Sequence, residues 1–203
     1  MLHVLLIRHA MTDMVDVGLP GRKPGIHLND SGRREADILA DRLSVFPIRA
    51  FFSSPLERAV ETVGPACGRF GMEPRISDLL NEVDFGEWTG RNFESLKGDE
   101  VWWRFNHVRS TVRIPCGETM LEVQKRAVLQ MENIASEFTS GIAAVVSHGD
   151  VIRTTLAYYA GFPIDMLTRI TIDTISISMI AIGEGRPRII CVNCVHDISQ
   201  LLD

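Results

Sequence analysis

The chain has 203 residues, of which 45% are hydrophobic and 23% charged, with a formal net charge of −5 at pH 7. This composition is typical of a globular protein, and the length suffices for one domain with a full core. The acidic balance argues against nucleic acid as a partner, because nucleic-acid-binding domains are usually basic, but a small anion can still bind where arginines gather in a cleft.

Neither a membrane segment nor a disulfide scaffold is indicated. No stretch approaches the roughly 18 apolar residues of a membrane span, and the first apolar run, cut by Arg8, is too short for a secretory signal. Four cysteines in a chain of this length do not form a disulfide framework, so we expect a cytoplasmic protein with no membrane partner. Cys191 and Cys194 fall in a predicted strand, where residues three apart point to opposite faces, and we expect them to have no zinc or redox role.

The first predicted strand covers residues 3–7, an apolar run typical of a strand buried on both faces of a parallel sheet. Arg8 and His9 follow at its carboxyl end, where open α/β sheets bind their ligands. Adjacent side chains of a strand point to opposite faces, so the two can meet one ligand only if the chain turns at His9. Such a pair alone is more often structural than catalytic, and a site is indicated only if other strand ends carry similar residues.

A long loop and a helix come next. Residues 14–28 are rich in glycine and proline and show no period, which predicts a loop. Loops of this length within a domain are often functional, and the stretch around Arg22 can return over the site. Residues 30–45 have apolar side chains at helical spacing, which predicts a helix capped at its start by Asn29 or Asp30.

Residues 48–53 form the second predicted strand, and a helix is predicted to follow it, with Ser54 as N-cap and Pro55 at the first helical position. Gly71 ends this helix. Arg58 then lies in the first turn, close to the carboxyl edge of the sheet. A second strand end therefore offers a guanidinium group.

The following segment supplies a carboxyl group. Residues 75–80 form a weak predicted strand, and Glu82 and Asp84 follow it in a loop that Gly86 ends. Apolar neighbours flank both acids, and an acid held against apolar side chains has a raised pKa. Of the two, Glu82 is the better candidate for such an acid.

Residues 92–117 show no clear pattern apart from a short predicted helix around Trp102 and several arginines. We expect this segment to form a cap over the cleft, a solvated charged face being the alternative. The longest predicted helix covers residues 117–139, and the third buried strand covers residues 142–146. His148 comes directly after this strand region, so a second imidazole stands at a strand end.

The last part of the chain predicts a helix and a hairpin. A helix is predicted over residues 151–159, and from about Ile170 the sequence alternates Thr or Ser with Ile. A glycine-rich turn separates this stretch from the apolar run 188–192, which predicts an antiparallel hairpin. The elements together predict the α/β class: a three-layer sandwich with a mostly parallel central sheet, flanking helices and a C-terminal antiparallel hairpin. We expect residues 1–203 to form a single domain; the sequence does not indicate an oligomeric state.

The sequence lacks the residue patterns that several other phosphate-transfer mechanisms require. None of the lysines follows a glycine, as the P-loop requires. No cysteine is followed by an arginine six positions later, as in a Cys-thiolate phosphatase, and no two aspartates are separated by one residue, as an aspartyl-phosphate mechanism requires. The histidines are scattered singly and no H-E-x-x-H occurs, so we expect no catalytic metal.

Four short motifs follow one another along the chain: R-H-A-M-T at 8–12, S-S-P-L-E-R-A at 53–59, E-V-D-F-G at 82–86 and S-H-G at 147–149. In this order and spacing they resemble the signatures of the histidine phosphatase superfamily, in its phosphoglycerate-mutase-like branch 1. L-N-D-S-G at 28–32 and G-E-T at 117–119 resemble two further elements of that family. The resemblance extends from residue 3 to about residue 160, and four ordered motifs are far more specific than one R-H pair.

The resemblance implies a phosphohistidine enzyme. His9 would be the nucleophile, Arg8, Arg58 and His148 would bind the phosphate, and Glu82 would protonate the leaving group. These residue types suit those roles, because guanidinium and imidazole N–H groups donate to phosphate oxygens. The nucleophile needs a neutral ring whose other nitrogen donates to a carbonyl.

Two positions depart from the family pattern. Ala10 stands where the family usually has glycine, and Val15 stands where many members have an asparagine that contacts the phosphate. That hydrogen bond must come from elsewhere, and Thr12, Arg22 or backbone near Gly21 are the candidates. With Gly149, these three form the predicted substrate-binding set, although Arg22 can equally be a solvated side chain.

We therefore expect a metal-independent phosphomonoesterase without a cofactor, acting on a small phosphorylated metabolite. A phosphoglycerate mutase is one alternative, although the mutases of this family are typically longer. A domain that only binds a phosphorylated ligand is another. The substrate itself is not indicated, because the selecting residues fall in the loop 14–28 and the cap 92–117.

Overall fold

The computed structural model describes residues 1–196, and one sheet forms its centre. Its strands are β1 (Leu2–Arg8), β2 (Ile48–Ser53), β3 (Arg75–Ile76), β4 (Gly141–Ser147), β5 (Ile177–Ile182) and β6 (Arg188–Cys194). Their order across the sheet is β3-β2-β4-β1-β5-β6. Pairing is parallel from β3 through β2 and β4 to β1. By contrast, β5 pairs antiparallel with β1, and β6 pairs antiparallel with β5.

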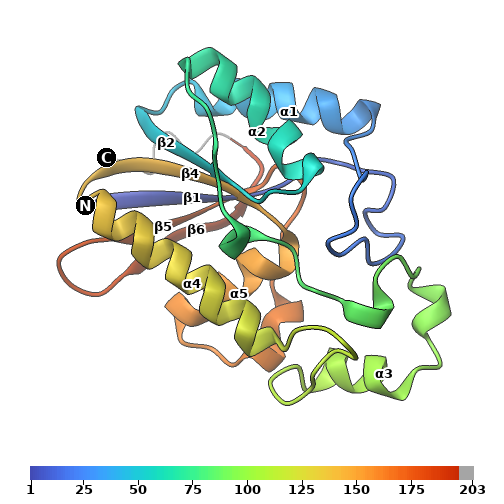
Figure 1. Ribbon diagram of the computed structural model, residues 1–203. Helices are drawn as coiled ribbons and strands as arrows, with labels where there is room; N and C mark the ends of the chain where they lie inside the picture. The colour runs from blue at the N-terminus through green and yellow to red at the C-terminus, as the bar shows by residue number, and fades with distance from the viewer. Residues whose placement is uncertain (197–203) are drawn as a thin grey trace.

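Helices cover both faces of the sheet (Figure 1). One face is covered by α1 (Asp30–Leu43) and α2 (Glu57–Phe70), and the other by α4 (Met120–Glu137) and α5 (Gly149–Ala160). α3 (Glu100–His107) lies away from the sheet at the periphery (Figure 1). Short 3₁₀ helices complete the chain: η1 (Asp78–Leu80), η2 (Gly86–Trp88), η3 (Glu94–Leu96) and η4 (Ile164–Arg169). The predicted three-layer α/β sandwich with a C-terminal antiparallel hairpin is confirmed.

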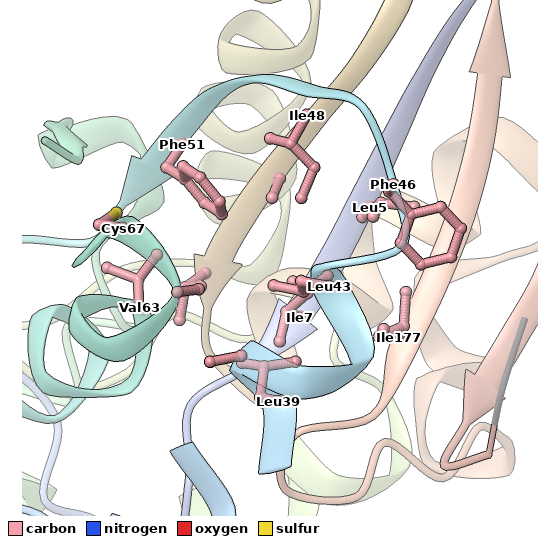
Figure 2. Packing of buried hydrophobic residues seen from close by; sticks show 14 of the residues in the cluster. Leu5, Ile7, Leu39, Leu43, Phe46, Ile48, Phe51, Val63, Cys67 and Ile177 are labelled. Carbon is pink, nitrogen blue, oxygen red and sulfur yellow. The ribbon is translucent and has the colours of Figure 1, made fainter. Parts of the chain in front are cut away.

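Strand β1 is buried on both faces, which explains its uninterrupted apolar sequence. Leu5 and Ile7 belong to the core cluster under α1 and α2, where they pack with Leu39 and its neighbours (Figure 2). Val4 and Leu6 belong to the cluster under α4 and α5. Because two layers of side chains hold the strand, the residues at its carboxyl end have a fixed position.

The start of α1 agrees with the predicted capping chemistry. The side chain of Asn29 accepts a hydrogen bond from the Gly32 N–H at 2.9 Å at the start of α1. Thr119 and Glu122 form a capping box at the start of α4.

The predicted cap of α2 is wrong. This helix begins at Glu57, and its N-cap is Leu56, which makes no side-chain hydrogen bond to the helix. Ser54 instead continues the line of β2, because its N–H donates to the Val146 carbonyl at 3.0 Å. Its hydroxyl lies 2.8 Å from Nε2 of His148. Tertiary contacts at the end of the sheet therefore use the serine that local propensity assigns to a helix cap.

The segment before β5 is a loop rather than the start of the predicted alternating strand. Residues 170–176 lie outside any strand, and two of their backbone groups hold Arg8. The Ile172 carbonyl accepts from Arg8 Nη1 at 2.7 Å, and the Ile175 N–H donates to the Arg8 carbonyl at 3.1 Å. The loop is fastened to β6, because the Asn193 side chain bonds the Asp173 N–H and carboxylate at 2.7 and 2.8 Å.

Cys191 and Cys194 lie on the same side of the hairpin, contrary to the prediction from strand alternation. Ile177 pairs with Cys194 and Met179 with Cys191, so β6 has one more residue than β5 over this stretch, and both cysteines pack against one core cluster. This is a β-bulge, which shifts the alternation by one residue. Burial, followed by the contact with Cys194, raises the pKa of the Cys191 thiol to about 12, so this thiol stays protonated at neutral pH.

Residues 1–196 contain neither a membrane-spanning helix nor a cluster of metal ligands. None of the helices in this range is long and apolar enough to cross a membrane. The range also contains no group of three or more His, Cys, Asp or Glu side chains able to hold a metal ion.

Candidate active site

The register of β1 and β4 brings together the R-H motif at residues 8–9 and the H-G motif at residues 148–149. β1 and β4 pair so that Arg8 lies beside Ser147, and the His9 N–H donates to the Ser147 carbonyl at 2.9 Å. The chain then leaves the sheet at both points. His9 and His148 therefore meet at one edge, with their ring centres 5.2 Å apart.

His9 is held as a neutral imidazole with one ring nitrogen directed at the backbone. Its Nδ1 lies 2.8 Å from the Ala10 carbonyl oxygen, an acceptor to which Nδ1–H donates. Burial, followed by the Arg58 guanidinium, lowers the pKa of His9 to about 3. The ring thus carries its proton on Nδ1, and Nε2 has a free lone pair at neutral pH.

His148 is fully buried and is also neutral. Burial is the largest cause of its lowered pKa, and the charge of Arg58 is the next. Its Nε2 lies 2.8 Å from the Ser54 hydroxyl, whereas its Nδ1 has no hydrogen-bond partner among residues 1–196 and lies 3.6 Å from the Glu82 carboxylate.

Two arginines bring positive charge to this edge. Arg58 is fully buried, and its Nη2 donates to the Gly21 carbonyl at 2.9 Å, but its Nε and Nη1 are unpaired within the described chain. Arg8 donates from Nη1 to Ile172, and its buried Nε is likewise unpaired there. Burial lowers the pKa of both guanidinium groups, but both remain cations at neutral pH.

Several buried donors at this edge have no acceptor among the described residues. Leaving a buried N–H without a partner costs about 1–3 kcal/mol, and more for a charged group. Three such N–H positions occur on the two arginines, Arg8 Nε, Arg58 Nε and Arg58 Nη1, and Nδ1 of His148 is a further buried nitrogen without a partner among the described residues. Their chemistry fits an anion with several acceptor oxygens.

Glu82 is positioned by its backbone. Its carbonyl accepts from Arg22 Nε at 2.9 Å and from Arg126 Nη2 at 3.0 Å, and Arg126 is itself paired with Glu118. The Glu82 carboxylate accepts from the Val83 N–H at 2.8 Å. Burial raises the pKa of this carboxyl above its ordinary value, although Arg58 opposes the shift. Glu82 is thus the acid with a raised pKa that its apolar neighbours predict.

A cavity of about 180 Å³ opens at this edge. It is smaller than the roughly 300–1,000 Å³ of typical drug-sized ligand sites, which favours a small ligand. The residues lining it are Arg8, His9, Thr12, Met14, Val15, Asp16, Gly18, Leu19, Pro20, Glu82, Phe85, Phe93, Gly149, Asp150 and Arg153. Arg58 and His148 are buried next to His9 and Glu82 and do not line the cavity.

Two members of the predicted substrate-binding set do not line the cavity. The guanidinium of Arg22 is held by the Glu82 carbonyl and, at 2.9 Å, by the Glu118 carboxylate. The Gly21 carbonyl accepts from Arg58, and its φ of 52° is a backbone angle that glycine adopts without strain. Both residues contact other residues of the site rather than the cavity. The predicted Thr12 and Gly149 do line the cavity.

Sequence reasoning did not single out Asp150 or Arg153, which also line the cavity. Asp150 and Arg153 begin α5 and are joined by an ion pair of 2.8 Å, and their spacing of three in the sequence is the one available signal. Asp16 and Phe93 reach the cavity from the loop 14–28 and the segment 92–117, which were expected to border the site, although the sequence singled out neither residue. Of residues 92–117, only Phe93 lines the cavity within the part of the chain described.

The fold and the site together define a class of protein: an α/β protein with arginines and neutral imidazoles gathered at the carboxyl ends of its strands, where such sheets bind their ligands. Residues 4–195 match the histidine phosphatase superfamily (branch 1). The chain belongs to this superfamily, as the motifs predict, and with it to the phosphoric monoester hydrolases that act on small phosphorylated metabolites.

Individual relatives agree with this assignment. The chain is 27% identical to phosphoserine phosphatase 1 of Hydrogenobacter thermophilus over 98% of this chain and 96% of the relative. It is 28% identical to a probable phosphoglycerate mutase of Yersinia pestis over 91% and 87% of the two chains. Among solved structures, a phosphoserine phosphatase of Entamoeba histolytica in complex with phosphoserine has a TM-score of 0.88 at 22% identity, covering 98% of this chain and 100% of that one.

Proposed function

We propose that this protein is a metal-independent phosphomonoesterase that works through a phosphohistidine on His9. The observation that carries the proposal is the set of buried, unpaired N–H donors around a neutral imidazole. A phosphate monoester supplies acceptor oxygens for Arg8, Arg58 and His148. The arginines also neutralise its charge, so that a nucleophile can approach the phosphorus.

The first half of the reaction forms the intermediate. Nε2 of His9 attacks phosphorus, the N–P bond forms, and the bond between phosphorus and the substrate oxygen breaks. The departing oxygen takes the proton of Glu82, whose raised pKa keeps the acid protonated closer to neutral pH than an ordinary glutamate. The alcohol leaves, and the phosphoryl group remains on His9.

The second half returns the enzyme to its starting state. The Glu82 carboxylate takes a proton from water as the water oxygen attacks phosphorus, and the N–P bond breaks to release inorganic phosphate. The Nδ1–H of His9 keeps its hydrogen bond to Ala10 throughout, so the same tautomer is ready for the next cycle. His9, Glu82 and the two arginines supply the nucleophile, the acid and the cations, so no metal is assigned to a step.

The proposed cap is residues 92–117. Phe93 contributes to the wall of the cavity, and Arg109 pairs with Asp150 at 3.2 Å, which ties this segment to the start of α5. An apolar ring at the mouth reduces access of water to the reacting phosphorus.

The test measures phosphate release from p-nitrophenyl phosphate in EDTA and looks for the covalent intermediate. We expect turnover to persist in EDTA, and an acid-labile, alkali-stable label to appear on the protein when radiolabelled substrate is quenched. We expect His9→Ala to lose both label and turnover, the latter by at least about 10³-fold. Turnover of His9→Ala at the wild-type rate would overturn the proposal.

The relatives also name a second candidate, a phosphoglycerate mutase. The two activities share the phosphoenzyme and differ in whether water or a second hydroxyl accepts the phosphoryl group. Incubation with 3-phosphoglycerate separates them, because a phosphatase releases inorganic phosphate and a mutase interconverts phosphoglycerates. A protein that binds phosphate tightly but never becomes labelled would instead be a binding domain.

A further inference from the structure

Ser54 and His148 make a buried contact at the ends of two neighbouring strands. They directly follow β2 and β4, which pair in parallel, and both side chains are fully buried. The hydroxyl oxygen of Ser54 lies 2.8 Å from Nε2 of His148. A hydroxyl can donate or accept, and a neutral imidazole carries its one proton on either ring nitrogen. The direction of this hydrogen bond therefore decides which nitrogen of His148 is protonated.

The other partner of the Ser54 hydroxyl indicates that direction. The hydroxyl oxygen accepts from the Leu56 N–H at 3.4 Å, so its own proton is the group that still needs a partner. Among residues 1–196, Nε2 of His148 is the one acceptor within hydrogen-bond distance of this hydroxyl. Burying a hydroxyl proton without an acceptor is unfavourable. Ser54 is therefore the donor, and Nε2 is the unprotonated nitrogen of the ring.

With Nε2 as the acceptor, the proton of the neutral His148 ring is on Nδ1. The ring is neutral because burial, followed by the charge of Arg58, lowers its pKa well below the ordinary value. Nδ1 has no hydrogen-bond partner among the described residues, and its 3.6 Å to the Glu82 carboxylate is too long for a hydrogen bond. The ring centre lies 5.2 Å from that of His9. An N–H donor is thus held beside both the proposed nucleophile and the proposed acid.

We propose that Ser54 is a positioning residue that holds His148 in its Nδ1–H tautomer, so that this N–H donates to a phosphoryl oxygen of the substrate. The inference rests on the proposed phosphatase function and adds the residue that fixes one of its donors. In the opposite tautomer, Nδ1 would present a lone pair to the phosphoryl oxygen, and two acceptors repel each other. His9 is held in the same tautomer by the Ala10 carbonyl, so a hydrogen bond to one nitrogen sets the role of the other in both rings.

The tautomer can be measured without any activity assay. In protein whose imidazole nitrogens are isotopically labelled, protonated and unprotonated ring nitrogens give well-separated NMR signals, and comparison with His148→Gln identifies the signals of this ring. We expect the wild-type protein at neutral pH to carry the proton of His148 on Nδ1. His9 should show the same tautomer and serves as the internal reference. A proton on Nε2 of His148 would overturn the inference.

Variants of Ser54 connect the tautomer to catalysis. Ser54→Ala removes the donor to Nε2, so His148 should become a mixture of tautomers, and kcat/KM should fall by about 10- to 100-fold, since deleting such a donor outright costs about 10²–10³. The fall should be equal for O-phosphoserine and p-nitrophenyl phosphate, because the lost bond is to the phosphoryl group and not to the leaving group. Ser54→Thr keeps the hydroxyl and should restore the tautomer and most of the activity. Ser53→Ala is the matched control: the Ser53 hydroxyl is also fully buried but donates to the Ser54 carbonyl at 2.9 Å, so its loss should leave the tautomer unchanged.

The outcomes separate the inference from the function on which it rests. If the wild-type protein hydrolyses neither ester, the proposed function fails, and the inference fails with it. If both esters are hydrolysed but Ser54→Ala keeps the Nδ1–H tautomer, whether or not it loses activity, only the inference is overturned. Should Ser54→Ala not fold, titration of the wild-type protein with inorganic phosphate decides: the Nδ1–H signal of His148 must shift, whereas that of His107 in α3, outside the cavity wall, must not. An unshifted His148 signal would overturn the inference.

Discussion

Nδ1 of His148 lies 3.6 Å from Oε2 of Glu82, but the two side chains do not form an ordinary ion pair. The histidine has a lowered pKa and the glutamate a raised one, in both cases chiefly through burial. The two side chains therefore meet as a neutral imidazole and a carboxyl group biased toward its acid form. A bound phosphate adds negative charge beside them, which favours the protonated acid further.

Replacing Glu82 should affect substrates according to their leaving groups. Glu82→Gln removes the proton donor, so kcat for O-phosphoserine should fall by about 10²–10⁴. The fall should be much smaller for p-nitrophenyl phosphate, because its phenolate leaves without a proton. Steady-state kinetics with both substrates measure this difference. Asp84→Asn, whose side chain does not line the cavity, serves as the control. An equal loss on both substrates would contradict the acid role.

The pH dependence of kcat should reflect the two shifted groups. Because burial raises the pKa of Glu82, the acid form persists above the usual range of a glutamate, and kcat for a poor leaving group should fall as pH rises through the raised value. On the acid side, His9 has a pKa of about 3, so no loss of nucleophile is expected near pH 6.5. Glu82→Gln should abolish the alkaline decline. A decline that survives in this variant would assign it to another group.

Stability should decrease in acid because two histidines are buried as neutral rings. The pKa of His9 and that of His148 are lower in the folded chain than the ordinary 6.5, so the unfolded chain binds more protons below pH 6.5. The stabilisation is complete above pH 6.5 and is lost as pH falls toward the folded values. Urea unfolding at pH 7 and pH 5 measures the slope, which should be smaller in His9→Asn. His27 is the control. Its hydrogen bond with Glu61 raises its pKa, so the stability that this histidine contributes is lost as pH rises rather than as pH falls.

Replacing Arg58 should lower the activity without lowering the stability of the fold. Its charge is fully buried and two of its nitrogens are unpaired within the described residues, so Arg58→Met should leave the melting temperature unchanged or raise it. The same change should lower kcat/KM by at least about 10³-fold. It should also remove the stabilisation by inorganic phosphate, which for the wild-type protein is about 2.7 kcal/mol at 100 times Kd. A strongly destabilised variant that still binds phosphate would contradict this account.

Asp16 should influence which phosphate ester is preferred. Its exposed carboxylate lines the cavity and lies near enough to Arg8 to raise the pKa of that guanidinium. It should attract the ammonium group of O-phosphoserine and repel 3-phosphoglycerate. Asp16→Asn should therefore lower the ratio of kcat/KM for these two esters by about threefold or more. Asp13→Asn, outside the cavity wall, is the matched control, and an equal change there would rule out a local effect.

The sequence predicted the parts of the fold that depend on local patterns. The apolar run of β1 and the 3.6-residue spacing of α1 each reflect burial, which the residues themselves encode. The site set of Arg8, His9 and the second imidazole was predicted because strand ends of a parallel sheet meet at one edge and because the motifs resemble a known family.

The remaining features depend on tertiary contacts that no local pattern encodes. Ser54 has the propensity of a helix cap but bonds His148 across the sheet. The bulge that brings Cys191 beside Cys194 comes from one extra residue in β6. Asp150 and Arg153 have the spacing of an ordinary surface ion pair, and only the folded chain reveals Arg109 on the other side of the carboxylate.

The loop at 170–176 makes the first arginine of the site depend on the last strand of the sheet. Ile172 and Ile175 hold Arg8, and Asn193 in β6 holds the loop through Asp173. The hairpin supplies no side chain to the cavity, yet its outer strand helps to hold the guanidinium that we propose binds the substrate. Asn193, although it lies outside the cavity, therefore helps to fix the position of Arg8.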